Sequence, residues 1–204
     1  MIYVVTDIET DGPAHGANSM IAFASVAIHD DGAVLDEFEA VLKPRGDRAP
    51  DPDTMAWWRT QPDAWAAATQ NAEPAADVMP RYADWVDGLC DRSERRVFAA
   101  KPLAFDGPYM DEYLRTFAGT RYFDGPFAGR QIFQGPGLDI VSFAMGLFGA
   151  VEVPSVYAAI PDEWLGSHPH THRAIDDARG YAHLLGRLLA IAREAPKRDD
   201  DFLR

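Results

Sequence analysis

The chain of 204 residues carries a formal net charge of -13 and one cysteine, Cys90, and 47% of its residues are hydrophobic. This length and composition predict an ordinary globular protein with one substantial core. The lone cysteine excludes internal disulfides and a thiolate zinc cage, so any bound metal must have oxygen or imidazole ligands. The negative net charge argues against a protein that binds long nucleic-acid duplexes by counterion release.

Targeting signals are not evident in the sequence. No apolar run approaches the roughly 18 residues of a membrane span, and no basic segment precedes an apolar one as in a signal peptide. We therefore expect a cytoplasmic location and no membrane partner, while a homodimeric state remains open.

The first half of the chain predicts an antiparallel meander. Apolar residues dominate 1–5, 20–29 and 33–42, and Asp30-Asp31-Gly32 between the last two runs has hairpin chemistry. Prolines, glycine and charges in 44–52 indicate a loop, and a short helix is expected around Thr54 to Trp58.

The rest of the chain alternates between helical and strand patterns, which favours an α/β protein with a mixed sheet and helices on its faces. Helices are predicted over 75–89, 107–117, 138–148 and 173–193, and short strands over 96–100 and 131–134. We expect residues 1–195 to form one domain and residues 196–204 to form a charged, mobile tail.

Two acids stand where the first apolar run ends. Side chains alternate along a strand, so Asp7 and Glu9 point the same way and Ile8 points to the other face. Two like charges at such a short separation repel each other unless a cation lies between them. The pair is therefore either a solvent-facing accident or half of a metal site.

Further acids and a histidine follow in two later segments. Asp106 lies between a short hydrophobic run and a helix with an aromatic inner face. Helical periodicity places Asp177 on the core-facing side of the last helix and Asp176 on its solvated side. A carboxylate on a buried stripe is costly unless it is paired or metal-bound. His172, on the loop before this helix, could swing over the same site.

Together these stretches resemble the motifs of the DEDDh 3′-5′ exonucleases, the RNase H-like group that includes polymerase proofreading subunits and RNase T. The resemblance rests on Asp-Ile-Glu at 7–9, Ala-Phe-Asp-x-x-x-Met-Asp at 104–111 and His-Arg-Ala-Ile-Asp-Asp-Ala at 172–178, in the family's order and separation. The segment 54–61 also resembles a helix of RNase T-like members. One departure is Pro102, where many members have an asparagine that orients substrate.

The resemblance implies an RNase H-like mixed five-stranded sheet flanked by helices. It also implies that Asp7, Glu9, Asp106 and Asp177 hold two Mg²⁺ or Mn²⁺ ions and that His172 is the general base. The implied activity releases nucleoside 5′-monophosphates from the 3′ ends of single-stranded RNA or DNA, with RNA slightly favoured.

Several residues have two readings. Trp57 and Trp58 can stack a terminal base or pack in the core. Thr10 is a further candidate substrate contact. Arg173 can meet phosphate or lie on a solvated helix face, and the same holds for Arg179 and Lys101. The alternating histidines His168, His170 and His172 could form a three-imidazole transition-metal site, although exposed loop histidines are the commoner case.

Other functions use similar residues. A DNA-directed 3′-5′ exonuclease and a nucleic-acid-binding module of the same fold are alternatives. So are a metal-dependent phosphomonoesterase and an RNase H-like endonuclease, but the histidine of the third motif favours an exonuclease.

Overall fold

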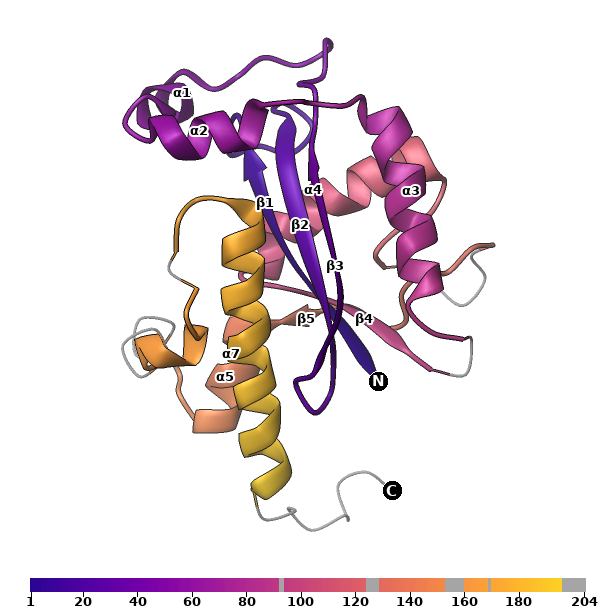
Figure 1. Cartoon of the computed structure of the whole chain (residues 1–204), viewed down its shortest axis with the longest axis vertical. Helices are drawn as coiled ribbons and strands as arrows, with labels where there is room; N and C mark the ends of the chain where they lie inside the picture. The colour runs from indigo at the N-terminus through magenta and orange to yellow at the C-terminus, as the bar shows by residue number, and fades with distance from the viewer. Residues whose placement is uncertain (92–93, 124–128, 153–159, 169, 196–204) are drawn as a thin grey trace.

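A mixed five-stranded sheet in the order β3-β2-β1-β4-β5 forms the centre of the molecule (Figure 1). The computed structural model describes residues 1–91, 94–123, 129–152, 160–168 and 170–195. The strands are β1 (Ile2–Thr10), β2 (Met20–His29), β3 (Val34–Val41), β4 (Arg96–Ala100) and β5 (Leu138–Asp139). The first three strands are antiparallel neighbours, whereas β4 and β5 run parallel to β1. The predicted fold class is confirmed.

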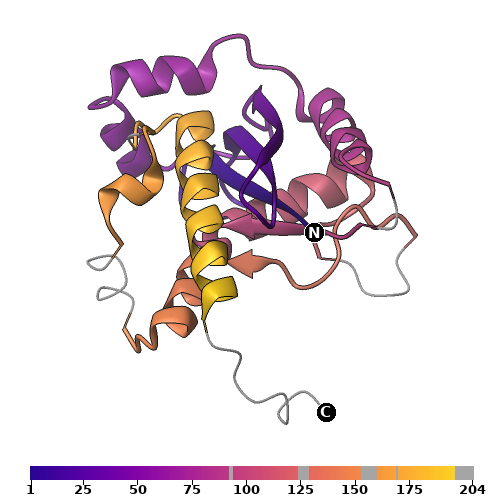
Figure 2. The same ribbon diagram turned by 60° about the horizontal axis from the view of Figure 1, so that its bottom comes forward.

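Helices cover both faces of this sheet and one of its ends. On one face lie α3 (Ala75–Gly88), α4 (Leu103–Tyr113) and the π-helical turn Leu114–Ala118; on the other lie α5 (Ile140–Phe148) and α7 (Ala174–Glu194). The short helices α1 (Pro52–Trp58) and α2 (Pro62–Thr69) lie across the end of the sheet where β1 finishes, and a 3₁₀ turn spans Asp162–Leu165 (Figures 1 and 2).

Alternation along β1 divides the core in two. Val4 and Ile8 pack with α3 and α4, while Val5 packs with α5 and α7. Asp7 and Glu9 have the same parity as Val5 and therefore face α7. The strand continues through both acids to Thr10, so they lie within the sheet and not beyond the strand's end as the apolar run suggested.

Two predicted elements differ in the structure, and one helix was not predicted. Residues 131–134 are not a strand: Gln134 is anchored to the start of β4, where its backbone N donates to the Arg96 carbonyl (2.8 Å), and the fifth strand is instead Leu138–Asp139. Helix α4 begins four residues earlier than expected, which puts Asp106 in its first turn. Helix α2 was missed, although Pro62 and Asp63 in its first turn are ordinary start signals.

No helix in the described part of the chain is both long and apolar enough to cross a bilayer. The expected tail 196–204 lies outside the described residues.

Candidate active site

The site forms where the pairing between β1 and β4 stops. The parallel ladder ends at Thr6 and Ala100, after which the chain leaves β4 and enters α4. Asp7 and Glu9 therefore keep β2 as a neighbour on one side, opposite Ala24 and Ala22, while the β4 side is open. Small alanine side chains on β2 leave room beside both carboxylates.

Asp106 enters this opening from α4. The backbone N–H of Ile8 donates a hydrogen bond to the Asp106 carboxylate, so the side chain takes the place of the missing ladder partner of β1. The start of α4 is held by Asp139, whose carboxylate accepts from the Leu103 backbone N (2.8 Å) and from that of Ser142 (2.7 Å). Sequence reasoning missed Asp139, although an acid directly before an apolar helix is a typical N-cap.

Asp177 approaches from the first turn of α7. Its Oδ1 accepts from the backbone N of Thr171 (3.1 Å) and lies 3.0 Å from His170 Nδ1. Oxygens of Asp7, Glu9 and Asp177 lie within 4.8 Å of one another. The neighbouring acid is directed elsewhere: Asp176 is partly exposed, accepts from the Thr171 hydroxyl and lies near Arg173 and Arg179. The predicted difference between the two aspartates is confirmed.

All four acids are buried, since none is more than 9% exposed. Asp106 is not in the group whose oxygens lie within 4.8 Å of one another, but it lies close enough to Asp7 and Glu9 to raise their pKa values. Burial raises the pKa of Asp7 well above its ordinary value, and repulsion by Asp106, Glu9 and Asp177 adds to the increase. Burial raises the pKa of Glu9 to about 9, and repulsion by Asp177 and Asp106 adds to the increase. Burial raises the pKa of Asp106 to about 8 despite the opposing bond from Ile8. Burial also raises the pKa of Asp177, and His170 opposes this increase.

This donor set fits divalent cations. Asp106 Oδ2 is buried and accepts no hydrogen bond from any described residue. Buried acceptors without partners and clustered carboxylates are costly unless a cation compensates them. Hard cations such as Mg²⁺ prefer carboxylate oxygens, and Asp7, Glu9, Asp106 and Asp177 are the residues that would hold them.

His172 lies beside this cluster on the loop before α7. Its backbone has φ 56, a left-handed conformation that is uncommon outside glycine. Its ring stands edge-to-face with Trp57 at 4.9 Å and with His170 at 4.3 Å between centroids. Burial lowers the pKa of His172 below its ordinary 6.5, and His170 adds to this while Asp177 opposes it. The imidazole is therefore neutral at pH 7.

The two tryptophans of α1 have different environments. Trp58 is 2% exposed, and its Nε1 donates to the Thr10 carbonyl (2.9 Å), which ties α1 to the end of β1. Trp57 is 39% exposed and lies against His172. Of the two alternatives predicted for this pair, Trp58 packs in the core, and only Trp57 presents substantial surface to a ligand. The Thr10 hydroxyl donates to the Gly12 carbonyl (2.8 Å).

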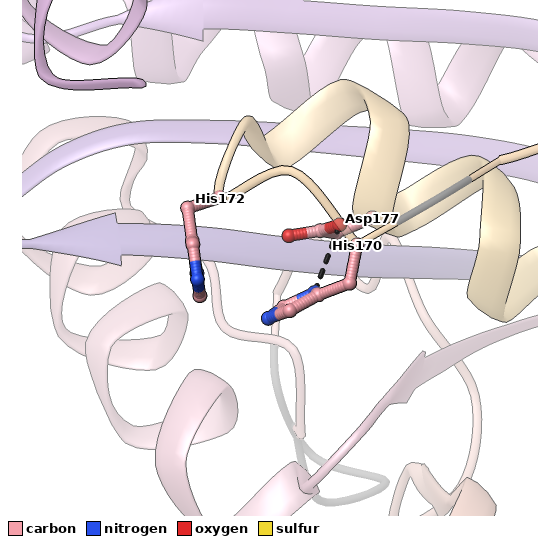
Figure 3. A group of neighbouring side chains, drawn as sticks. All are labelled: His170, His172 and Asp177. Carbon is pink, nitrogen blue, oxygen red and sulfur yellow. Dashed lines mark ion pairs between the residues drawn. The ribbon is translucent and has the colours of Figure 1, made fainter. Parts of the chain in front are cut away.

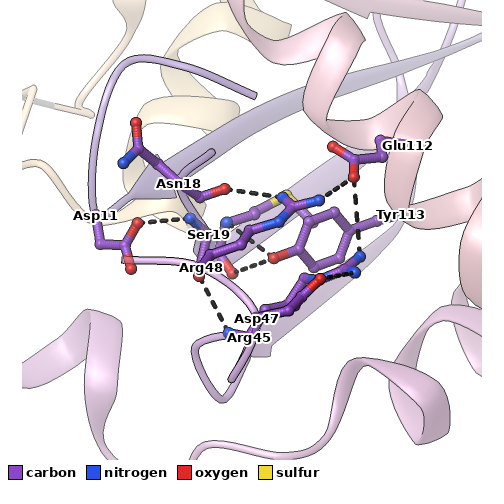
Figure 4. A network of polar contacts seen from close by, with 9 residues as sticks. Asp11, Asn18, Ser19, Arg45, Asp47, Arg48, Glu112 and Tyr113 are labelled. Atoms are coloured by element: carbon purple, nitrogen blue, oxygen red, sulfur yellow. Dashed lines mark hydrogen bonds and ion pairs between the residues drawn. The ribbon is translucent and has the colours of Figure 1, made fainter. Parts of the chain in front are cut away.

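A polar network fixes the loops that follow β1 and β3 (Figure 4). Arg48 donates to the Asn18 carbonyl (2.8 Å) and pairs with Glu112 of α4, while Asp11 accepts from the Ser19 backbone N. Gly12 is required here because a Cβ on it would lie 2.3 Å from Asn18 Cγ. The network holds the chain leaving β1 against α4.

Basic residues near the site are engaged in different ways. Lys101, directly after Ala100, lies close enough to Asp7 to oppose the rise in its pKa, and its Nζ lies 4.3 Å from the Tyr181 ring centroid. Burial lowers the pKa of Lys101, while Asp7, Asp177 and Asp106 oppose the shift. Arg179 forms a two-pronged ion pair with Glu37 (2.5–3.1 Å), whereas Arg173 is half exposed.

The three-imidazole site does not form within the described residues. His170 and His172 group with Asp177, whereas His168 is not part of that group: its carbonyl packs on Gly180. The spacing alone could not reveal this, because alternate residues of a loop need not share a side.

Comparison with known proteins identifies the family of this arrangement. The family model described as the 3′-5′ exoribonuclease Rv2179c-like domain matches residues 2–189. The chain belongs to this family. The Rv2179c-like domain is also 25% identical over 202 residues to the 3′-5′ DNA exonuclease Cap18 of Escherichia coli, covering 97% of this chain and 96% of the relative.

Solved structures share the fold of this Rv2179c-like domain. The nuclease domain of 3′hExo, a DEDDh family member bound to rAMP, superposes with a TM-score of 0.64 at 16% identity, covering 93% of this chain and 92% of that one. Escherichia coli exonuclease I in complex with a dT13 oligonucleotide has a TM-score of 0.60 at 15% identity, covering 99% of this chain and 42% of that one. The expected identity as a 3′-5′ exonuclease of the DEDDh type is confirmed.

Proposed function

We propose that this exonuclease removes nucleoside 5′-monophosphates from single-stranded 3′ ends, with Asp7, Glu9, Asp106 and Asp177 holding two Mg²⁺ or Mn²⁺ ions. The observation that carries the proposal is the buried carboxylate cluster at the open edge of β1, which includes an Asp106 oxygen without a hydrogen-bond partner. When bound, such ions neutralise charge on a phosphodiester and lower the pKa of a water molecule.

His172 is the proposed general base. A neutral imidazole accepts a proton from the attacking water, and the lowered pKa of His172 keeps it in that state at neutral pH. The water oxygen forms a bond to the terminal phosphorus while the bond to the 3′-oxygen of the preceding nucleotide breaks. The terminal residue leaves with its 5′-phosphate.

Substrate binding is proposed to rely on the last one or two nucleotides. Trp57 lies against His172 and is 39% exposed, so part of its ring is available for stacking on a terminal base. Arg173, half exposed at the start of α7, is the proposed phosphate contact. With a net charge of -13 the protein has little means of holding a long backbone, so we expect low processivity and a shallow salt dependence.

RNA is proposed to be the slightly favoured substrate, because the matched family is described as exoribonuclease. The alternative is DNA, and it is favoured by the relative that is named a DNA exonuclease. A preference for RNA requires a group that reads the 2′-hydroxyl.

The test is a time course on matched RNA and DNA oligonucleotides, single-stranded and paired, with free or blocked 3′ ends. We expect Mg²⁺- or Mn²⁺-dependent release of 5′-monophosphates from free single-stranded 3′ ends, faster on RNA. Digestion of blocked ends would identify an endonuclease instead, and undiminished activity in excess chelator would refute the metal-dependent reading. Oligonucleotide binding without turnover would indicate a binding module, and faster digestion of DNA would favour the alternative substrate.

A further inference from the structure

Two histidines and one acid form a second group of ligand atoms (Figure 3), which shares Asp177 with the carboxylate cluster. One ligand atom from each of His170, His172 and Asp177 lies within 4.8 Å of the others. His170 Nδ1 and Asp177 Oδ1 are already 3.0 Å apart. In a tetrahedral zinc site with bonds of about 2.0–2.1 Å, neighbouring ligand atoms are about 3.3 Å apart. Small side-chain movements therefore suffice to surround one ion.

The chemistry of this group differs from that of the carboxylate cluster. Two imidazoles and one carboxylate suit Zn²⁺ and related transition metals, whereas Mg²⁺ prefers oxygen ligands alone. His170 is about half exposed, with 53% of its side chain accessible, so an ion can reach the group from solvent.

We propose that His170, His172 and Asp177 form a transition-metal site that takes Zn²⁺ and that its occupation inhibits the exonuclease. Asp177 belongs to both groups of ligand atoms, so an ion held by the histidines draws this carboxylate away from Asp7 and Glu9. The same ion uses a nitrogen lone pair of His172, which then cannot accept a proton. The inhibitory effect rests on the proposed function, whereas the binding of Zn²⁺ does not.

The first experiment measures binding without turnover. Purified full-length chain is titrated with Zn²⁺ against a colorimetric chelator, and with Co²⁺, whose visible absorption reports a tetrahedral nitrogen-containing site. We expect one ion per chain and an affinity at least about tenfold lower in His170→Asn and in His172→Asn. The matched control is His168→Asn. His168 lies in the same histidine-rich segment but outside the group, so this variant should bind Zn²⁺ with the parent's affinity.

Two results of the binding experiment would overturn the proposal. If Asp7→Asn weakens Zn²⁺ binding and His170→Asn does not, the ion sits in the carboxylate cluster. If all three histidine variants lose affinity equally, the loop binds zinc without a defined site. Circular dichroism of each variant confirms that an affinity change does not reflect unfolding.

The second experiment measures inhibition. Micromolar Zn²⁺ is added to the exonuclease in millimolar Mg²⁺, and each variant is compared with its own zinc-free rate. We expect the parent and His168→Asn to be inhibited alike and His170→Asn to need at least about tenfold more Zn²⁺. Equal sensitivity of His170→Asn would refute the inhibitory role. Absence of turnover without zinc would instead contradict the proposed function and leave the binding result unaffected.

Discussion

Asp177 and Asp176 are adjacent residues with opposite surroundings. Asp177 is 3% exposed and lies among the oxygens of the cluster, whereas Asp176 is partly exposed beside two arginines. Asp177→Asn should reduce kcat by about 10²-fold or more, because a neutral amide loses several kcal/mol of charge stabilisation. The matched control is Asp176→Asn, whose kcat should stay within about threefold of the parent's. Equal losses in single-turnover assays would contradict the assigned faces of α7.

The second prediction at this scale concerns His172 as the general base. His172→Ala should lower kcat by about 10²- to 10⁴-fold while Mn²⁺ binding by the acids persists, because general-base help has this magnitude. His168→Ala should keep the parent rate. Since the pKa of His172 is lowered below 6.5, the parent's rate should fall at acidic pH as the imidazole takes up a proton, and protonation of the carboxylates adds to the decline. An unchanged kcat in His172→Ala at neutral pH would assign the proton to another group.

At the scale of elements, helix α1 serves both the core and the site. Trp58 is buried and bonded to the Thr10 carbonyl, so Trp58→Ala should lower the free energy of unfolding by about 3–5 kcal/mol. Trp57→Ala removes a largely exposed ring and should leave the free energy of unfolding within about 1 kcal/mol of the parent.

Trp57 and Trp58 should also differ in their contribution to substrate binding. Trp57→Ala should raise KM roughly 5- to 150-fold on single strands, because stacking contributes about 1–3 kcal/mol per base. Chemical denaturation and steady-state kinetics on both variants provide the two measurements. A Trp57→Ala protein with the parent's KM would show that this ring does not contact substrate.

At the scale of the whole molecule, the site opposes the stability of the metal-free fold. The pKa of Glu9 is about 9 in the folded chain and near 4.5 when unfolded, so folding takes up a proton between these values. The stabilisation from the protonated form is complete below pH 4.5 and disappears as pH rises through about 9. The melting temperature in chelator should therefore fall from pH 5 to pH 9.

Glu9→Gln tests this linkage. Because glutamine needs no proton on folding, the metal-free variant should be about 1–3 kcal/mol more stable than the parent at pH 8, which corresponds to about 2–12 °C in melting temperature. The difference should shrink at pH 5 and in saturating Mg²⁺, which compensates the parent's charge. A parent whose stability does not depend on pH in chelator would contradict the buried-charge account.

The sequence by itself determined the family, the face of Asp7 and Glu9, and the inward direction of Asp177. The family followed from the resemblance of three motifs in their order and separation, whereas the two orientations depend on local periods, 2.0 residues in a strand and 3.6 in a helix. The strand at 96–100 and most helices were predicted because their apolar faces recur at these periods.

Only the tertiary structure decided which residues meet. The end of the β1–β4 ladder at Thr6 and Ala100 creates the opening that Asp106 fills, and its position depends on how two distant strands align. The same holds for His170, which reaches Asp177 only because the loop before α7 folds back on the helix. Sequence patterns could not separate Trp57 from Trp58, since both are apolar and adjacent. The end of β1 separates them in the structure. The Trp58 indole donates to the Thr10 carbonyl, whereas the Trp57 ring lies beside His172.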